Sequence, residues 1–288
     1  MATNIVSFDV PDRRNACSQC ALRGLCLPGG LAPDEMGQLE AVIGVRRKIR
    51  RGQYLYRSGD EFSAIHAIRR GFFKTEVLAE DGRDQVTGFQ MAGDFLGMDG
   101  ISNEVHTCNA VALEDSEVCR IPYVDLEHLS SKLPKLQHHF YKLMSREIVR
   151  DQGVMAWLGS LGADKGLAAF LLNLSQRLAI RGYSSSEFHL RMTRKEIGSH
   201  LGVRLQTVSR SFSRFQEEGL VSVQQKHIRI LDISRLKKLM DPDPSDPSCV
   251  QASPVRIART ALLQDAQCRP GTRIRSSRRT ADASSHAT

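Results

Sequence analysis

The spacing of apolar and polar positions changes twice along the chain, and these changes divide it into regions. Over residues 46–121, short apolar runs alternate with glycine-containing turns, which is typical of a β-barrel or jelly roll. Before this region, residues 33–45 have an apolar face at helical spacing. After it, the spacing predicts a brief helix over 123–132, a long helix over 134–158 and another over 164–181. The predicted fold class is therefore α+β, with an N-terminal β-roll (jelly roll) followed by helices.

The pattern near the C-terminal end of these helices predicts a helix-turn-helix. Thr193 and Glu196 form a capping-box sequence that opens one helix, Gly202 ends it, and a second helix follows. Residues 220–231 then have the pattern of a β-hairpin, so the unit is predicted to be a winged helix-turn-helix. The apolar positions of its two helices are spaced to share one small core, formed by Ile197, Leu201, Val203, Val208, Phe212 and Phe215.

The polar face of the second helix predicts contacts with DNA. In the major groove, Arg210 would bond guanine O6 and N7, and Gln206 and Ser209 would bond neighbouring base edges. An ordinary solvated helix face is the simpler alternative, but the capped helix, the glycine turn, the shared core and the wing together favour DNA binding. Phosphate contacts are expected from four further cations, which are Lys195, Arg204, Arg214 and Lys226.

The long amphipathic helix predicts a homodimer interface, because it lies between two folded modules that would otherwise leave its apolar stripe exposed. The alternative is a helix that packs only on its own domain. The residues expected at the interface are Phe140, Leu143, Ile148, Met155 and the charged Asp151, which interrupts the stripe.

These changes of pattern give the expected domain boundaries. The final region begins with a Pro/Ser-rich run, has many arginines and little periodicity, and is predicted to be disordered. The expected segments are a cysteine-containing segment over 1–30, the β-roll domain over 31–128, a dimerisation helix over 129–163, the winged helix-turn-helix domain over 164–240 and a basic tail over 241–288.

Composition adds a partner class and a compartment. The 288 residues carry a net charge of +8, which weakly favours a polyanionic partner. The sequence has neither a secretory signal nor a run of about 18 apolar residues, so a cytoplasmic protein with no membrane span is expected. Neither a P-loop nor a nucleophile–base pair is recognisable, which argues against an enzyme.

Three of the seven cysteines, Cys17, Cys20 and Cys26, fall within ten residues. In a cytoplasmic protein such a group is more typical of metal ligands or reduced thiols than of disulfides. The spacing alone leaves zinc, an iron–sulfur cluster and free thiols open.

Together these motifs make the chain resemble the oxygen-responsive FNR branch, including the Anr-type proteins, of the CRP/FNR family of bacterial transcription regulators. The likeness covers roughly residues 17–233. Its most specific parts are the Cys-x2-Cys-x5-Cys pattern and the segments 85–89, 117–122, 143–148, 169–175, 196–202, 207–210 and 214–216.

The resemblance implies a [4Fe-4S] cluster held by Cys17, Cys20, Cys26 and Cys119, in keeping with the four thiolates that such a cluster requires. Cys108 competes for the fourth place, but only Cys119 lies in the family's Val-Cys-x-Ile-Pro context. The resemblance also implies that the β-roll is a sensor domain and that the intact cluster favours the dimer. Oxygen would then degrade the cluster and weaken DNA binding. The implied partners are double-stranded DNA at palindromic TTGAT-like sites, RNA polymerase at anaerobic-response promoters that the regulator would activate, and a second copy of the chain.

Two positions qualify this resemblance. The family's reading motif is Glu-x-x-Ser-Arg, and here Gln206 replaces the glutamate, so a relaxed base preference is expected at that position. Asp151 lies on the expected dimer stripe. Burying two like charges across a two-fold axis is costly, so Asp151 is expected to keep the clusterless chain near the monomer.

Three other functions compete with this interpretation. A cyclic-nucleotide-responsive regulator would need an arginine where this chain has His106-Thr107. A CRP-like regulator could instead answer a small ligand, nitric oxide or thiol redox, with zinc or no metal at the cysteines. An iron–sulfur enzyme is disfavoured because no substrate-site constellation is recognisable.

Overall fold

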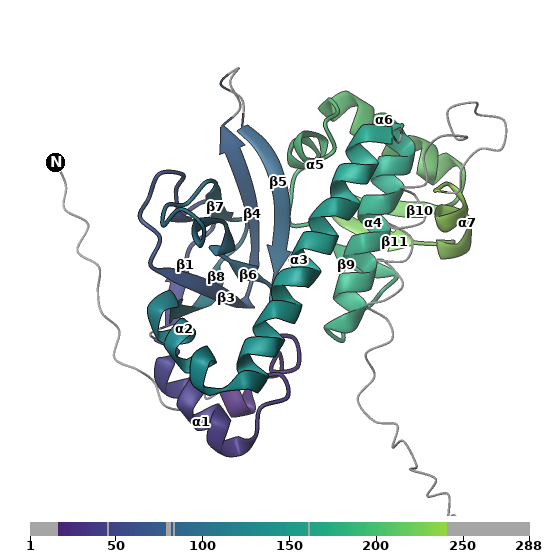
Figure 1. Cartoon of the computed structure of the whole chain (residues 1–288). Coiled ribbons are helices and arrows are strands. Elements are labelled where there is room, and N and C mark those ends of the chain that lie inside the picture. Colours follow the sequence, from purple (N-terminus) through teal and green to yellow (C-terminus); the bar gives the residue numbers. More distant parts are fainter. Residues whose placement is uncertain (1–16, 45, 79–81, 83, 161, 241–288) are drawn as a thin grey trace, which may run out of the picture.

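The computed structural model describes residues 17–44, 46–78, 82, 84–160 and 162–240. A β-roll and a C-terminal helical module lie side by side, and the long helix α3 (Pro134–Ser160) runs between them (Figure 1). The N-terminal segment, with the short 3-10 helix η1 (Cys17–Gln19) and helix α1 (Pro33–Val42), lies at the end of the β-roll where α3 begins (Figure 1).

Two four-stranded antiparallel sheets form the β-roll, in the orders β1-β8-β3-β6 and β2-β7-β4-β5. Phe73, Ile68 and Val118 are fully buried between them, which explains the short apolar runs of the sequence. The strands are β1 (Arg46–Ile49), β2 (Tyr54–Tyr56), β3 (Ala64–Arg70), β4 (Phe72–Leu78), β5 (Asp84–Met91), β6 (Phe95–Leu96), β7 (Asn109–Ala112) and β8 (Ser116–Pro122); a 3-10 turn, η2 (Met98–Gly100), follows β6.

Helix α2 (Tyr123–Lys132) and the first half of α3 close one end of the roll. Leu39 of α1, Leu126 of α2 and Leu136 of α3 are buried in one core with the β-roll. Phe140 and Leu143 belong to the same core, with only 7% and 6% of their surface exposed. Both were expected at the dimer interface, and for them that prediction is wrong: packing on their own domain leaves them unavailable to a partner.

The C-terminal module confirms the predicted helix-turn-helix with its wing. Two elements were not predicted: strand β9, which is too short to show a periodic pattern, and helix α7, which is capped by the Asp232 carboxylate accepting from the Arg235 N–H at 2.9 Å. The elements are α4 (Ala163–Ile180), β9 (Glu187–His189), α5 (Arg194–His200), α6 (Leu205–Glu217), β10 (Val221–Gln224), β11 (His227–Ile230) and α7 (Ile233–Lys238).

The β-roll and the C-terminal module share one hydrophobic core. Phe72, Val86 and Phe89 of the roll pack in the same cluster as Leu171 of α4 and Phe212 of α6. Burial of this apolar surface favours a fixed arrangement of the two parts over a flexible tether.

Residues 1–16 and the predicted basic tail over 241–288 lie outside the described residues. In the part of the chain that is described, none of the helices combines the length and the apolar character that crossing a bilayer requires.

Candidate functional site

The cysteine segment is a run of tight turns. The Cys20 N–H donates to the Cys17 carbonyl at 3.1 Å, and the Cys26 N–H donates to the Leu22 carbonyl at 3.0 Å. The Ser18 N–H donates to the Glu40 carboxylate at 2.9 Å, which ties the segment to α1. The three thiols are therefore held on a compact loop that is fixed to the β-roll.

Cys119 comes from strand β8, in the interior of a sheet. It pairs with Arg46 of β1 on one side and with Ala67 of β3 on the other. Cys119 and Cys26 both pack against the core that contains the start of α3. The fourth predicted ligand thus lies on the part of the roll that the cysteine segment covers.

The thiols of Cys17 and Cys26 have raised pKa values. Burial, together with the smaller effects of Cys119, Glu40 and Cys20, raises the pKa of Cys17 to about 12. Burial also raises the pKa of Cys26, with additions from Cys17, Cys119 and Cys20. Four thiolates gathered in this way repel one another, so a bound cationic centre would be needed to keep them ionised.

Cys17, Cys20, Cys26 and Cys119 are free cysteines, and four thiolates are the donors that a [4Fe-4S] cluster requires. The same donors would also suit a tetrahedral zinc ion. Within the described residues, no three His, Cys, Asp or Glu side chains are placed to hold a metal ion.

His139 of α3 contacts the cysteine segment, which the sequence did not predict. Its Nε2 donates to the Cys26 carbonyl at 3.0 Å, and a Cβ on Gly29 would lie 2.7 Å from its ring. Burial lowers the pKa of His139, which favours its neutral form. The start of the long helix is therefore joined directly to the loop that carries three of the cysteines.

Cys108 lies in a different part of the β-roll. Its thiol is 3.5 Å from the Asp99 carboxylate, and burial, together with Asp99, raises its pKa to about 12. Cys108 packs in the core between the two sheets, whereas Cys119 packs against the core beneath the cysteine segment.

At the segment 106–107, where a cyclic-nucleotide pocket would need an arginine, His106 is buried among aromatic side chains and Thr107 is exposed. The His106 ring stacks on Tyr56 with 3.7 Å between the ring centroids, and Phe62 meets His106 edge-on at 5.6 Å. His106 is only 4% exposed. These contacts hold the His106 ring in the interior of the β-roll.

The helix-turn-helix is built as its sequence predicts. The Glu196 N–H donates to Thr193 Oγ1 at 3.2 Å, and the Thr193 N–H donates to the Glu196 carboxylate at 2.7 Å, so the capping box is formed. A Cβ at Gly198 would lie 2.7 Å from the Val203 carbonyl, so only glycine permits this close approach of α5 to the turn.

The predicted reading face of α6 is open. Gln206 and Arg210 are exposed and Ser209 is half-buried, while Val208 and Phe212 face the core. Arg204 is the N-cap of α6 and makes no side-chain capping bond, as expected from the loss of a capping hydroxyl.

The four expected phosphate-binding cations differ in their surroundings. Lys195 and Arg204 are exposed. Lys226, in the turn of the wing, donates to the Arg191 carbonyl at 3.2 Å. Arg214 forms an ion pair with Asp164 at the start of α4, so a phosphate would have to compete with that carboxylate.

On α3, the solvent-facing stripe is not the one that packs on the β-roll. Tyr141 and Ile148 are 56% and 55% exposed, and Asp151 is exposed one turn further on. The Met155 side chain lies outside what the structure describes. Of the five expected interface residues, Ile148 and Asp151 lie on this exposed stripe of α3 and remain candidates for the dimer interface.

Comparisons with known proteins agree with this architecture. The model of the Cyclic nucleotide-binding domain family matches residues 46–132, and that of the Crp-like helix-turn-helix domain family matches residues 167–239. The transcriptional regulatory protein btr of Bordetella pertussis is 45% identical over 224 residues, which are 78% of this chain and 93% of that protein.

The transcriptional activator protein anr of Pseudomonas aeruginosa is 42% identical over 75% of this chain and 88% of its own length. The solved structure of FixK2 from Bradyrhizobium japonicum superposes with a TM-score of 0.63 at 25% identity, covering 70% of this chain and 98% of that one. Both the β-roll and the helix-turn-helix are included in these likenesses. The chain therefore belongs to the FNR branch of the CRP/FNR family of DNA-binding transcription regulators, and it is not an enzyme.

Proposed function

We propose that this regulator senses oxygen through a [4Fe-4S] cluster held by Cys17, Cys20, Cys26 and Cys119. The observation that carries the proposal is geometric: Cys26 of the cysteine loop and Cys119 of β8, from two distant segments, pack against the same core. When bound, such a cluster supplies an oxygen-labile centre. The chain's own contribution is to bury the thiols and, through Leu22 and Leu25, to limit access to them.

The cluster is proposed to favour a homodimer formed along α3. His139 joins the cysteine loop to the start of this helix, and the free stripe with Tyr141 and Ile148 is an apolar surface of the kind that pairs with a second copy. Asp151 lies beside that stripe, where two like charges would meet across the two-fold axis. This repulsion supports the view that the clusterless chain stays near the monomer.

The dimer is proposed to bind palindromic TTGAT-like sites at anaerobic-response promoters in the cytoplasm and to activate transcription with RNA polymerase. Arg210, Ser209 and Gln206 would read base edges from the exposed face of α6. The cations Lys195, Arg204, Arg214 and Lys226 would contact phosphates.

Anaerobic purification tests the cluster and the sensing together. The expected protein is brown, contains iron and sulfide, loses visible absorbance in air and protects a TTGAT-like site in a footprint only before exposure to air. A colourless protein that contains zinc, or a footprint that is the same before and after aeration, would overturn the proposal in favour of a regulator that answers another signal.

Sedimentation tests the role of Asp151. The Asp151→Ala variant is expected to remain dimeric after air exposure, at concentrations where the wild-type chain is monomeric. Identical sedimentation of the two proteins would remove Asp151 from the explanation.

A further inference from the structure

The turn formed by residues 91–94, between β5 and β6, lies where the cysteine segment meets the DNA-binding module. Gly93 has a φ of +92°, and a Cβ there would lie 3.3 Å from Leu25 Cδ1 and 3.7 Å from Arg181 Nε. Leu25 belongs to the cysteine loop, and Arg181 is the C-cap of α4. Leu25 of the cysteine loop and Arg181 at the end of α4 therefore both lie beside the face of Gly93 on which a side chain would project.

The same turn is also fixed to the strand beside Cys119. The Gly93 N–H donates to the Ile68 carbonyl at 2.7 Å, and the Ile68 N–H donates to the Asp94 carbonyl at 2.9 Å. Ile68 follows Ala67, which pairs with Cys119 in the sheet. A shift of the cysteine loop or of the strand beside Cys119 would thus move residues 93 and 94.

Asp94 binds arginines from both helices that lead to the DNA-binding module. Its carboxylate is 2.5 Å from Arg177 in the last turn of α4, 2.5 Å from Arg181 at the C-cap of that helix, and 3.8 Å from Arg150 of α3. Its side chain is only 8% exposed. Burial alone would raise the pKa of Asp94, but the three guanidinium groups hold it well below its usual range, so the carboxylate stays charged. The Met91 N–H completes its bonds at 2.8 Å.

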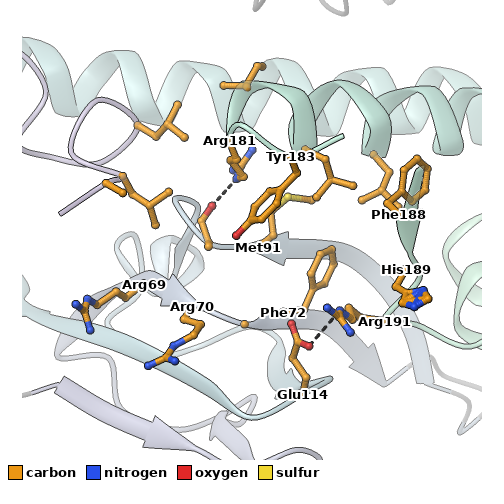
Figure 2. A pocket seen from close by; sticks show the side chains of 18 of the residues that line it. Arg69, Arg70, Phe72, Met91, Glu114, Arg181, Tyr183, Phe188, His189 and Arg191 are labelled. Atoms are coloured by element: carbon orange, nitrogen blue, oxygen red, sulfur yellow. Dashed lines mark hydrogen bonds and ion pairs between the residues drawn. The ribbon is translucent and has the colours of Figure 1, made fainter. Parts of the chain in front are cut away.

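A crevice of about 1350 Å³ opens beside Asp94 and its arginines, between the two parts of the molecule. Its lining includes Leu22 and Leu25 of the cysteine segment, Phe72 of the β-roll, and Tyr183 and Phe188 of the DNA-binding module. Figure 2 shows Arg181 reaching across one end of this space to the Ala92 carbonyl, and Arg191 reaching Glu114 farther along.

Helix α4 can carry a displacement from this turn to the DNA-reading helix. It has 18 residues and is therefore about 27 Å long. Asp94 holds its C-terminal end, while Asp164 in its first turn pairs with Arg214 of α6. A rigid helix fixed at both ends moves α6 when its C-terminal end moves.

We propose that Asp94 is a positioning residue that couples the cysteine loop to the DNA-reading helix within one protomer, in addition to any effect of dimerisation. The inference rests on the proposed function for its signal, whereas the contacts of Asp94 are made by the chain's own residues. Displacement of Leu25 changes the support of Gly93, the turn shifts Asp94, and Asp94 shifts α4 through Arg177 and Arg181.

Asp94→Asn is the direct test, because asparagine keeps an oxygen for the Met91 N–H and removes the charge that binds the arginines. Asp99→Asn is the matched control: Asp99 is also a carboxylate of the roll, but its partners Tyr56, His106 and Thr107 all lie inside the β-roll. In the metal-free proteins, hydrogen exchange is measured at the amides of residues 181–183, which bond back to the end of α4.

The expected result is exchange at these three amides that is about tenfold faster in Asp94→Asn than in the wild type and unchanged in Asp99→Asn. With cluster-loaded proteins, the ratio of DNA affinities before and after aeration should fall at least about fivefold in Asp94→Asn only. Iron content and sedimentation should match the wild type. Equal exchange and an equal affinity ratio in the wild type and Asp94→Asn would overturn the proposal.

A second variant removes the partner of Asp94 on α4 instead, in case Asp94→Asn does not fold. Arg181→Gln leaves the β-roll intact and should give the same faster exchange and the same smaller affinity ratio. An unchanged Arg181→Gln protein would also overturn the proposal. Failure of the proposed function gives a different result, because then the wild-type affinity does not respond to air, while the effect on hydrogen exchange in the metal-free variant remains.

Discussion

The cysteine site and the reading helix differ in how they are assembled. The helix-turn-helix takes its cap, its turn, its core and its reading face from one continuous stretch of sequence. The cysteine site takes three thiols from a loop and the fourth from a strand in the interior of a sheet. The first region depends on local rules, and the second depends on the register of β8. Since side chains alternate between faces along a strand, a shift of β8 by one residue would turn Cys119 away from the loop.

Removal of Cys119 should have the largest effect and shows how far the cysteine site depends on the distant strand. The Cys119→Ala variant is expected to bind almost no iron after anaerobic purification and to lose air-sensitive DNA binding. Iron and sulfide analysis measures the loss. Cys108→Ala is the matched control, because that thiol bonds Asp99 in another core. A normal iron content in Cys119→Ala, or loss of iron in Cys108→Ala, would reverse the assignment.

Removal of Arg210 should have the next largest effect. It tests the reading helix alone, because the change is expected in DNA binding and not in the cysteine site. The Arg210→Ala variant is expected to lose about 1–3 kcal/mol of binding free energy at the preferred site and to discriminate less at one base pair. Arg204→Ala should instead weaken binding to all sequences and lower the salt slope by about 1. The affinities of each variant for the preferred DNA site and for DNA sites with one base pair changed, measured at two salt concentrations, separate these outcomes. An Arg210→Ala protein with full discrimination would contradict the base contact.

Acid should weaken the contact between the β-roll and the C-terminal module through His200. This ring lies between Phe89 of the roll and Phe170 of α4, and burial lowers its pKa from 6.5 to about 4. The folded state therefore binds fewer protons than the unfolded state between these values, so stability is full above pH 6.5 and is lost as the pH falls. At pH 5 the loss is about 2 kcal/mol.

The measurement is the free energy of unfolding of the metal-free protein at pH 7 and pH 5. His200→Gln should show a smaller acid loss than the wild type, and the exposed His128→Gln should show the wild-type loss. Glu147 acts in the opposite direction, because burial raises its pKa to about 7, so the comparison is made between variants and not from the wild-type curve alone. Equal pH dependence in all three proteins would exclude His200.

Replacement of Gln206 should have the smallest effect. It is expected to change the base preference at one position more than the overall affinity for DNA. In Gln206→Glu the carboxylate accepts more strongly from cytosine N4, so discrimination at that base pair should increase by about 1 kcal/mol. Competition between half-sites that differ at this one base pair measures the change. Gln216→Glu, exposed at the far end of the same helix, is the control and should leave the preference unchanged.

The two regions also differ in how well they could be predicted. The helix-turn-helix was predicted closely, because capping and apolar spacing act between residues only a few positions apart. The apolar residues of α3 predicted the helix but not which stripe faces inward, so Phe140 and Leu143 were assigned to a partner when they pack on their own β-roll. His139 gave no signal in the sequence, because its partner is a backbone carbonyl of a distant loop.

By itself, the sequence determined the order of the elements, the helix-turn-helix with its reading face and the resemblance that singled out four cysteines. The tertiary structure decided which residues meet: Cys119 with the cysteine loop, His139 with Cys26, and Asp94 with Arg177 and Arg181. The physical reason is the separation along the chain of the residues that interact. Helix caps and apolar periodicity act within a few residues, whereas ion pairs and sheet register join residues that only the folded chain brings together.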